Sequence, residues 1–163
     1  MKPALFGKTR NELTELAVGL GLPKFTGKQL ADWLYHKDVD TIADMSNLSK
    51  KARELLEEHY SFGLHAPAKV QTSTDGTKKY LFETATENYI ETAMIPFNER
   101  RTVCVSSQVG CKMGCLFCMT GKQGFQGQLT AGDIVNQIRS IPERNEVTNI
   151  VYMGMGEPFD NLD

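Results

Sequence analysis

The chain has 163 residues, of which 40% are hydrophobic and 23% charged, and its formal net charge is −2. This length can bury one good core or two small ones, and the charge balance excludes the global basic field that many nucleic-acid-binding domains carry. No apolar run approaches the length of a transmembrane helix, and the chain starts without a basic-then-apolar signal segment, so we expect a cytoplasmic protein with no membrane partner.

The first region, residues 1–62, has the apolar periodicity of α-helices. Thr9 with Glu12 and Thr26 with Gln29 have the spacing of capping boxes, in which two side chains satisfy free backbone N–H groups at a helix start. Three apolar stripes predict three helices, and their residues are Leu13, Leu16, Ala17 and Leu20; Leu30, Trp33 and Leu34; and Leu48, Ala52, Leu55 and Leu56. We therefore expect a small helical domain.

The second region, residues 66–97, changes to strand signals. Runs rich in β-forming residues lie at 69–73, 79–84 and 89–95, and the last run ends at Pro96. The Asp75-Gly76 pair between the first two runs is typical of a hairpin turn. These signals predict a three-stranded antiparallel meander.

The third region, residues 98–163, has the order strand, loop, helix, strand. An apolar run over 102–106 precedes a cysteine-rich loop, and a helix capped by Thr130 and Asp133 leads to a second apolar run over 147–153. This order predicts one βαβ unit with parallel strands, so the expected fold class is α/β. Because parallel strands are normally covered on both faces, we expect the unit to be the truncated start of a larger domain and the chain to be a fragment.

Three cysteines lie in one short segment, residues 110–118, which we call the cysteine loop. Cys111, Cys115 and Cys118 have the spacing C-x3-C-x2-C. In a cytosolic protein, clustered cysteines bind a metal or do redox work, and thiolates select iron–sulfur clusters, Cu(I) or zinc. Three thiolates can hold three irons of a cubane cluster and leave the fourth iron without a protein ligand. The spacing therefore favours an iron–sulfur cluster with one iron open to chemistry.

Zinc is the main alternative metal. Structural zinc takes four ligands, most often as two pairs, whereas this chain has no second pair. His36, His59 and His65 lie upstream of the loop, and none is three to five residues from another. The fourth cysteine, Cys104, lies in the expected strand over 102–106. A zinc-stabilised RNA-binding module without catalysis stays open as an alternative, as do structural disulfides or buried thiols.

The cysteine loop, with Phe117 just before its last cysteine, resembles the cluster loop of radical S-adenosylmethionine (radical SAM) enzymes. One βαβ unit downstream, the Gly154-Met155-Gly156-Glu157-Pro158 segment resembles the cofactor-binding turn of that superfamily. With the flanks of both motifs, essentially the whole chain is similar to the RlmN/Cfr family of RNA methyltransferases, and more closely to its RlmN branch. The resemblance implies a partial radical SAM (βα) barrel, truncated here to its first βαβ unit.

The resemblance also implies which residues bind the cofactors. Cys111, Cys115 and Cys118 would hold a [4Fe–4S] cluster, and S-adenosylmethionine would bind the open iron. Gly156 and Glu157 would contact the cofactor, and Phe117 would lie near its adenine. Without the resemblance, Gly156 and Glu157 could simply form a strand exit.

Two catalytic residues are implied in the same way. Glu91 would be the general base that removes the C2 proton of the adenine. Cys104 would resolve the covalent adduct by forming a disulfide with a methyl-carrying cysteine that lies beyond this chain. Judged from sequence alone, Glu91 is a solvated strand carboxylate and Cys104 a buried, inert thiol.

The implied function is methylation of C2 of adenine in 23S ribosomal RNA and transfer RNA, and a Cfr-like methylation of C8 is the alternative within the family. The implied partners are these RNAs and an electron donor such as flavodoxin, and we expect a monomer whose residues 1–62 serve as an accessory RNA-binding domain. The candidate RNA contacts are Lys24 and Lys28; Lys50, Lys51 and Arg53; Lys78 and Lys79; Arg100 and Arg101; and Lys112 and Lys122. The 163 residues alone are expected to be inactive.

Overall fold

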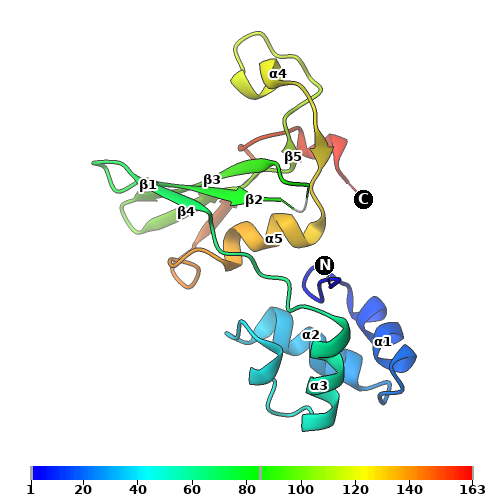
Figure 1. Ribbon diagram of the computed structural model, residues 1–163. Helices are drawn as coiled ribbons and strands as arrows, with labels where there is room; N and C mark the ends of the chain where they lie inside the picture. The colour runs from blue at the N-terminus through cyan, green and yellow to red at the C-terminus, as the bar shows by residue number, and fades with distance from the viewer. Residues whose placement is uncertain (1, 85, 163) are drawn as a thin grey trace. The chain divides into compact units, whose positions relative to one another are not determined.

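The computed structural model of the chain describes residues 2–84 and 86–162. It divides into two compact units, Met1–Leu64 and His65–Asp163 (Figure 1). The first unit is helical, and the second is a mixed α/β unit built on a sheet of five strands. Among the described residues, no helix has both the length and the apolar content needed to cross a bilayer.

The first unit contains α1 (Arg10–Gly19), α2 (Thr26–His36), the 3-10 helix η1 (Ile42–Asp44) and α3 (Lys50–His59). The three predicted helices are therefore present. They pack around fully buried apolar side chains, namely Leu5, Leu13, Ala17, Leu30, Leu34, Met45 and Leu56. A parallel bridge between Ala4 and Ser61 joins the two ends of the unit.

The two predicted capping boxes have different outcomes. Thr9 and Glu12 form the expected box at the start of α1, with both side-chain-to-backbone bonds present. The box predicted for Thr26 and Gln29 is wrong, because the residue that precedes α2 is Phe25 and no side chain caps this helix. Thr26 instead lies in the first turn of α2 with its side chain buried, so its hydroxyl does not occupy the N-cap position.

The sheet of the second unit has the order β1-β2-β3-β4-β7. Its strands are β1 (Lys69–Thr72), β2 (Lys78–Glu83), β3 (Tyr89–Phe97), β4 (Arg100–Cys104) and β7 (Asn149–Val151). The first four are antiparallel neighbours, which confirms the meander, and β7 pairs with β4 in parallel, which confirms the βαβ unit. The sequence placed residues 66–97 and 98–163 in separate regions, whereas both contribute strands to this one sheet.

Helix α5 (Ala131–Arg139) covers one face of the sheet (Figure 1). Its side chains Ile134 and Ile138 pack against a buried cluster that contains Tyr80, Phe82, Ile90, Met94 and Val103. Because side chains alternate along a strand, the residues between these point to the opposite face. We call it the open face; it carries Leu81, Glu91, Ala93, Cys104 and Val151, which are only partly buried or exposed.

The segment between β4 and α5 contains three short elements that the sequence did not predict. Strands β5 (Gln108–Val109) and β6 (Gly127–Gln128) pair in antiparallel fashion, so the two ends of the intervening segment, residues 110–126, lie side by side. This segment contains the cysteine-rich residues 110–118 and the short helix α4 (Met119–Gln123), and it projects from the second unit (Figure 1). After β7, the chain turns into the 3-10 helix η2 (Pro158–Asp160).

Candidate functional site

The two predicted motifs lie at the same edge of the sheet. The cysteine loop follows β4 and the segment Gly154–Glu157, which we call the glycine turn, follows β7. Since β4 and β7 are parallel, their carboxyl ends meet at one edge, which is where open α/β sheets place their ligand sites. The pairing continues past the strands, because the Val105 N–H donates to the Val151 carbonyl over 2.9 Å and the Gly154 N–H to the Val105 carbonyl over 3.1 Å.

The glycine turn is packed directly against the segment that leads to the cysteine loop. A Cβ atom on Gly154 would lie 2.7 Å from the Ser106 hydroxyl oxygen, and one on Gly156 would lie 2.6 Å from the Gln108 Cβ. Gly156 also has φ +98°, a conformation that favours glycine. Both glycines are therefore required by the backbone at these positions.

Glu157 is the acidic residue of the glycine turn. Its backbone N–H donates to the Gln108 side-chain carbonyl over 2.9 Å, which fixes the residue against the cysteine-loop side of the site. Its Oε1 accepts the Phe159 N–H over 3.0 Å, so the carboxylate caps η2. The side chain is half-buried and remains partly exposed to a ligand.

The cysteine loop carries three free thiols. Cys115 is exposed, and Cys111 and Cys118 are half-buried. The Met113 N–H donates to the Cys111 sulfur over 3.5 Å, and hydrogen bonds from the backbone of Gly121 and from Thr120 lower the pKa of Cys118, which favours its thiolate.

The donor set suits a cluster with three protein ligands, since thiolates stabilised by amide N–H groups are what iron–sulfur clusters take. The sulfurs are not gathered, because across residues 2–84 and 86–162 no three His, Cys, Asp or Glu side chains form a group that could hold a metal ion. Metal binding is commonly coupled to the folding of the segment that supplies the ligands. Holding a cluster requires the cysteine loop to draw its three sulfurs together.

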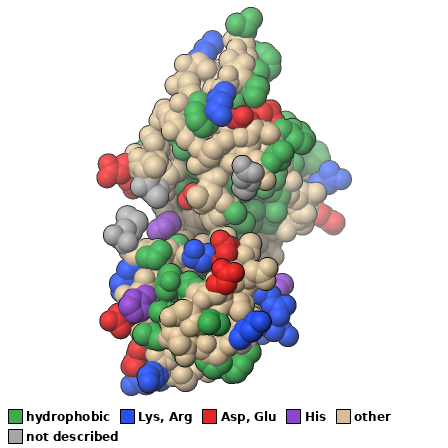
Figure 2. Space-filling view, turned by 90° about the vertical axis from the view of Figure 1, so that its right-hand side faces the viewer, with side chains coloured by type: hydrophobic (Ala, Val, Ile, Leu, Met, Phe, Trp, Pro, Cys, Tyr) green, Lys and Arg blue, Asp and Glu red, His purple; other side chains and the backbone are tan. Residues whose placement is uncertain are grey.

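The tip of the cysteine loop is apolar and open to solvent. Leu116 is 91% exposed and Phe117 is 92% exposed. Apolar and basic side chains gather on this projection in Figure 2. The structure therefore places Phe117, the residue expected near the cofactor adenine, on the outside of the loop.

Glu91 and Cys104 lie on the open face. Cys104 is in register with Ala93, which is two residues from Glu91 along β3, so the two side chains project from the same side of neighbouring strands. The Glu91 carboxylate is 49% exposed and pairs with the Lys79 ammonium over 3.0 Å. Glu91 and Lys79 line a hollow of about 200 Å³ together with Lys69, Gln71 and Leu81, and Cys104 is not part of its lining.

The Cys104 thiol is half-buried. Burial raises its pKa, against the opposing effect of a hydrogen bond from the Met153 backbone. At neutral pH the thiol therefore keeps its proton more firmly than an ordinary cysteine does, and it needs a proton acceptor before it can act as a nucleophile.

Several polar residues that organise the site were missed by the sequence reasoning. Ser106 and Gln108 are fully buried between β4 and the cysteine loop, and Gln137 is fully buried on α5. The Gln108 side chain donates to Asp160 over 2.8 Å, and Asp160 pairs with Lys112 of the cysteine loop over 2.8 Å. The available signal was a polar run directly after an apolar strand, Ser106-Ser107-Gln108.

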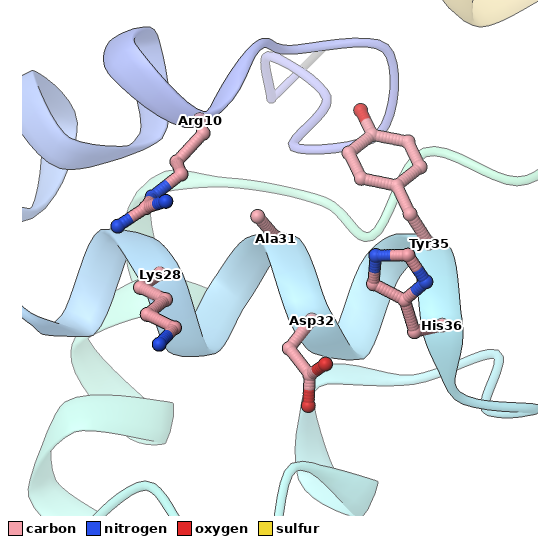
Figure 3. Close-up of a pocket in the computed structure, with 6 residues that line it drawn as sticks. All are labelled: Arg10, Lys28, Ala31, Asp32, Tyr35 and His36. Atoms are coloured by element: carbon pink, nitrogen blue, oxygen red, sulfur yellow. The ribbon is translucent and has the colours of Figure 1, made fainter.

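The helical unit has a cavity of its own, of about 330 Å³. It is lined by Arg10 from α1 and by Lys28, Ala31, Asp32, Tyr35 and His36 from α2 (Figure 3). The Tyr35 hydroxyl donates to the Lys8 carbonyl over 2.7 Å and accepts the Gly7 N–H over 3.0 Å, which fixes one wall. Arg10 and Lys28 outnumber the one carboxylate, so this wall of the helical unit is basic. Lys28 was among the candidate RNA contacts, and Arg10 was not.

Comparisons with known proteins match both units. Residues 4–61 match the family described as "Ribosomal RNA large subunit methyltransferase N-terminal domain", and residues 105–163 match the radical SAM superfamily. A "Probable dual-specificity RNA methyltransferase RlmN" of Phocaeicola vulgatus is 58% identical over 99% of this chain and 46% of the relative. The RlmN of Geotalea uraniireducens is 48% identical over 94% of this chain and 45% of the relative.

A solved structure is similar along the same length. The crystal structure of a radical SAM methyltransferase from Sphaerobacter thermophilus matches with a TM-score of 0.86 and 38% identity, over 98% of this chain and 49% of that chain. The chain therefore spans about half the length of the relatives it matches.

Proposed function

Because the chain belongs to the RlmN family within the radical SAM superfamily, we propose that the whole protein methylates C2 of adenine in 23S ribosomal RNA and in transfer RNA. The observation that carries this proposal is the meeting of two motifs at one sheet edge. Parallel pairing of β4 and β7 brings the cysteine loop and the glycine turn together, and the open face beside them carries a carboxylate and a thiol.

We propose that Cys111, Cys115 and Cys118 hold a [4Fe–4S] cluster. Gly156 and Glu157 contact S-adenosylmethionine, since the glycine lets the backbone approach a ligand closely and the carboxylate can accept hydrogen bonds from an ammonium group. Phe117, at the tip of the cysteine loop, would lie near the cofactor adenine. When bound, the cluster and S-adenosylmethionine supply radical chemistry and the methyl group.

The protein's own side chains then handle protons and the covalent adduct. Glu91 lies on the open face, partly exposed, where it can take the C2 proton from a bound adenine. Cys104, on the same face, attacks the sulfur of a methyl-carrying cysteine from outside these 163 residues. The sulfur–sulfur bond forms as the sulfur–carbon bond breaks, the electron pair of the broken bond passes to the carbon, and that carbon takes up a proton to become the methyl group of the released base.

We propose that the five-stranded sheet begins a partial (βα) barrel, with the open face toward its interior. The helical unit binds RNA, supported by the basic wall around Arg10 and Lys28 (Figure 3). The protein acts as a monomer in the cytoplasm, with an electron donor such as flavodoxin.

The test uses a hybrid protein, in which residues 1–163 of this chain replace the matching portion of the Phocaeicola vulgatus relative. The hybrid is expressed in bacteria that lack their own adenine-C2 methyltransferase, and nucleosides from 23S ribosomal RNA and transfer RNA are analysed by mass spectrometry. We expect 2-methyladenosine in both RNAs. Methylation at C8 supports the Cfr-like alternative, and unmodified adenine in both RNAs contradicts the proposal.

A further inference from the structure

One buried hydroxyl joins the two halves of the proposed site. Ser106 follows β4 and is fully buried. Its hydroxyl donates to the Glu91 carbonyl of β3 over 2.6 Å and accepts the Met155 N–H of the glycine turn over 2.9 Å. The same oxygen therefore bonds the backbone of the proposed base and the backbone of the proposed cofactor turn.

Ser106 is itself held in place by Gln137 of α5. The Gln137 side-chain carbonyl accepts the Ser106 N–H over 2.8 Å, and its amide group donates to the Ser106 carbonyl over 2.9 Å. Thr92, next to Glu91 on β3, donates its hydroxyl to the same Gln137 carbonyl over 2.7 Å. All three side chains are almost completely buried, so each of these bonds forms away from water, where a missing partner is costly.

Steric contact reinforces the hydrogen bonds. Gly154 approaches the Ser106 hydroxyl so closely that no Cβ would fit between them. The glycine turn therefore packs directly against Ser106, and a shift of the Ser106 side chain would shift the glycine turn.

We propose that Ser106 is a positioning residue that couples the glycine turn to β3 at Glu91, with Gln137 fixing the orientation of Ser106. The inference rests on the proposed function, in which the glycine turn binds S-adenosylmethionine and Glu91 is the base. In this role Ser106 acts through its bonds to the backbone of the glycine turn and of β3, and it keeps the proposed cofactor contacts in register with Glu91.

The chain offers a matched control in the next residue. Ser107 is also buried, and its hydroxyl has no hydrogen-bond partner in the described part of the chain. Ser106→Ala and Ser107→Ala each remove one buried hydroxyl group, and the two positions are neighbours. Only Ser106→Ala removes hydrogen bonds to the glycine turn and to β3.

The first measurement is amide hydrogen exchange of the cofactor-free hybrid protein. In Ser106→Ala we expect exchange of the Met155 amide to rise about tenfold, because a buried N–H loses its acceptor, and in Ser107→Ala we expect no change. Gln137→Met, which removes both amide bonds to Ser106, is a second variant and is expected to speed the same exchange. Unchanged exchange at Met155 in Ser106→Ala, or an equal rise in Ser107→Ala, overturns the inference.

The second measurement separates positioning from folding. At a temperature well below unfolding, Ser106→Ala is expected to raise the KM for S-adenosylmethionine about tenfold, with the KM for RNA unchanged. A lower unfolding temperature with unchanged KM values shows a purely structural role and overturns the inference. If the unsubstituted hybrid transfers no methyl group, the proposed function fails, whereas the exchange comparison still decides the coupling.

Discussion

Lys79 and Glu91 form an ion pair on the open face, and their separate substitution distinguishes a base from a structural charge. Each side chain is about half exposed, so the pair is screened by solvent and contributes at most about 1 kcal/mol to folding. Any large effect of replacing Glu91 must therefore come from the reaction.

We expect Glu91→Gln in the hybrid protein to lower methyl transfer by about 100-fold or more, because the amide cannot take the C2 proton. Lys79→Gln breaks the same ion pair and leaves the carboxylate, so its rate is expected to fall far less. The rates are compared at saturating S-adenosylmethionine and saturating RNA, so that a weaker binding of RNA by Lys79→Gln does not enter the comparison. Equal losses in the two variants would show that the ion pair matters and that Glu91 is not the base.

At the level of elements, a buried polar group joins the loop after α5 to the sheet. The Glu143 carboxylate pairs with Lys78 and accepts the Tyr80 hydroxyl over 2.5 Å. Burial alone would raise the pKa of Glu143, but the bonds from Lys78 and Tyr80 outweigh it and hold the pKa below its ordinary value of 4.5. Burial and the nearby Glu143 carboxylate raise the pKa of Tyr80, so the tyrosine stays protonated.

This arrangement predicts a loss of stability in acid. A carboxylate whose pKa is depressed by folding stabilises the protein above the unfolded-state pKa, and that stability is lost as the pH falls through the folded-state pKa. We expect Glu143→Gln to lose about 1–3 kcal/mol of unfolding free energy at pH 7, and to show a smaller further loss below pH 4.5 than the unsubstituted protein. Urea unfolding at the two pH values measures both effects.

The control for this variant is Glu146→Gln. Glu146 pairs with Arg101 over 3.8 Å and its side chain is 65% exposed, so its replacement is expected to change stability by less than about 0.5 kcal/mol. Equal losses for Glu143→Gln and Glu146→Gln would contradict the buried role of Glu143.

The elements show what sequence patterns can and cannot predict. The meander and βαβ unit followed from apolar periodicity, since burial of one face sets that pattern. Strand β7 covers only Asn149–Val151 of the apolar run over 147–153, and Tyr152 and Met153 beyond its end are exposed. The two-residue strands β5 and β6 are too short to leave a periodic signal and depend on pairing between distant segments.

Sequence patterns likewise predicted one part of the candidate site and missed another. Cysteine spacing and the glycine turn are local patterns, so the sequence alone located them. The bonds of Ser106 to Glu91 and Met155 depend on strand register and on the parallel pairing of β4 with β7, which no local pattern encodes. The pairing of Lys79 with Glu91 depends in the same way on the register of β2 and β3.

For the whole molecule, the account depends on the metal bound by the cysteine loop. Iron–sulfur and zinc sites differ in ligand number, and only a cluster with an open iron supports the proposed methylation. Replacing one thiol, as in Cys115→Ala, removes a proposed ligand that is exposed in the structure, so the change leaves the core intact.

The most direct test is the metal content of the hybrid protein, purified without oxygen from iron-replete cells. We predict about four irons and about four sulfides per chain with broad visible absorbance, and their loss in Cys115→Ala. A colourless protein with one zinc per chain, or an iron content that Cys115→Ala leaves unchanged, would contradict the account.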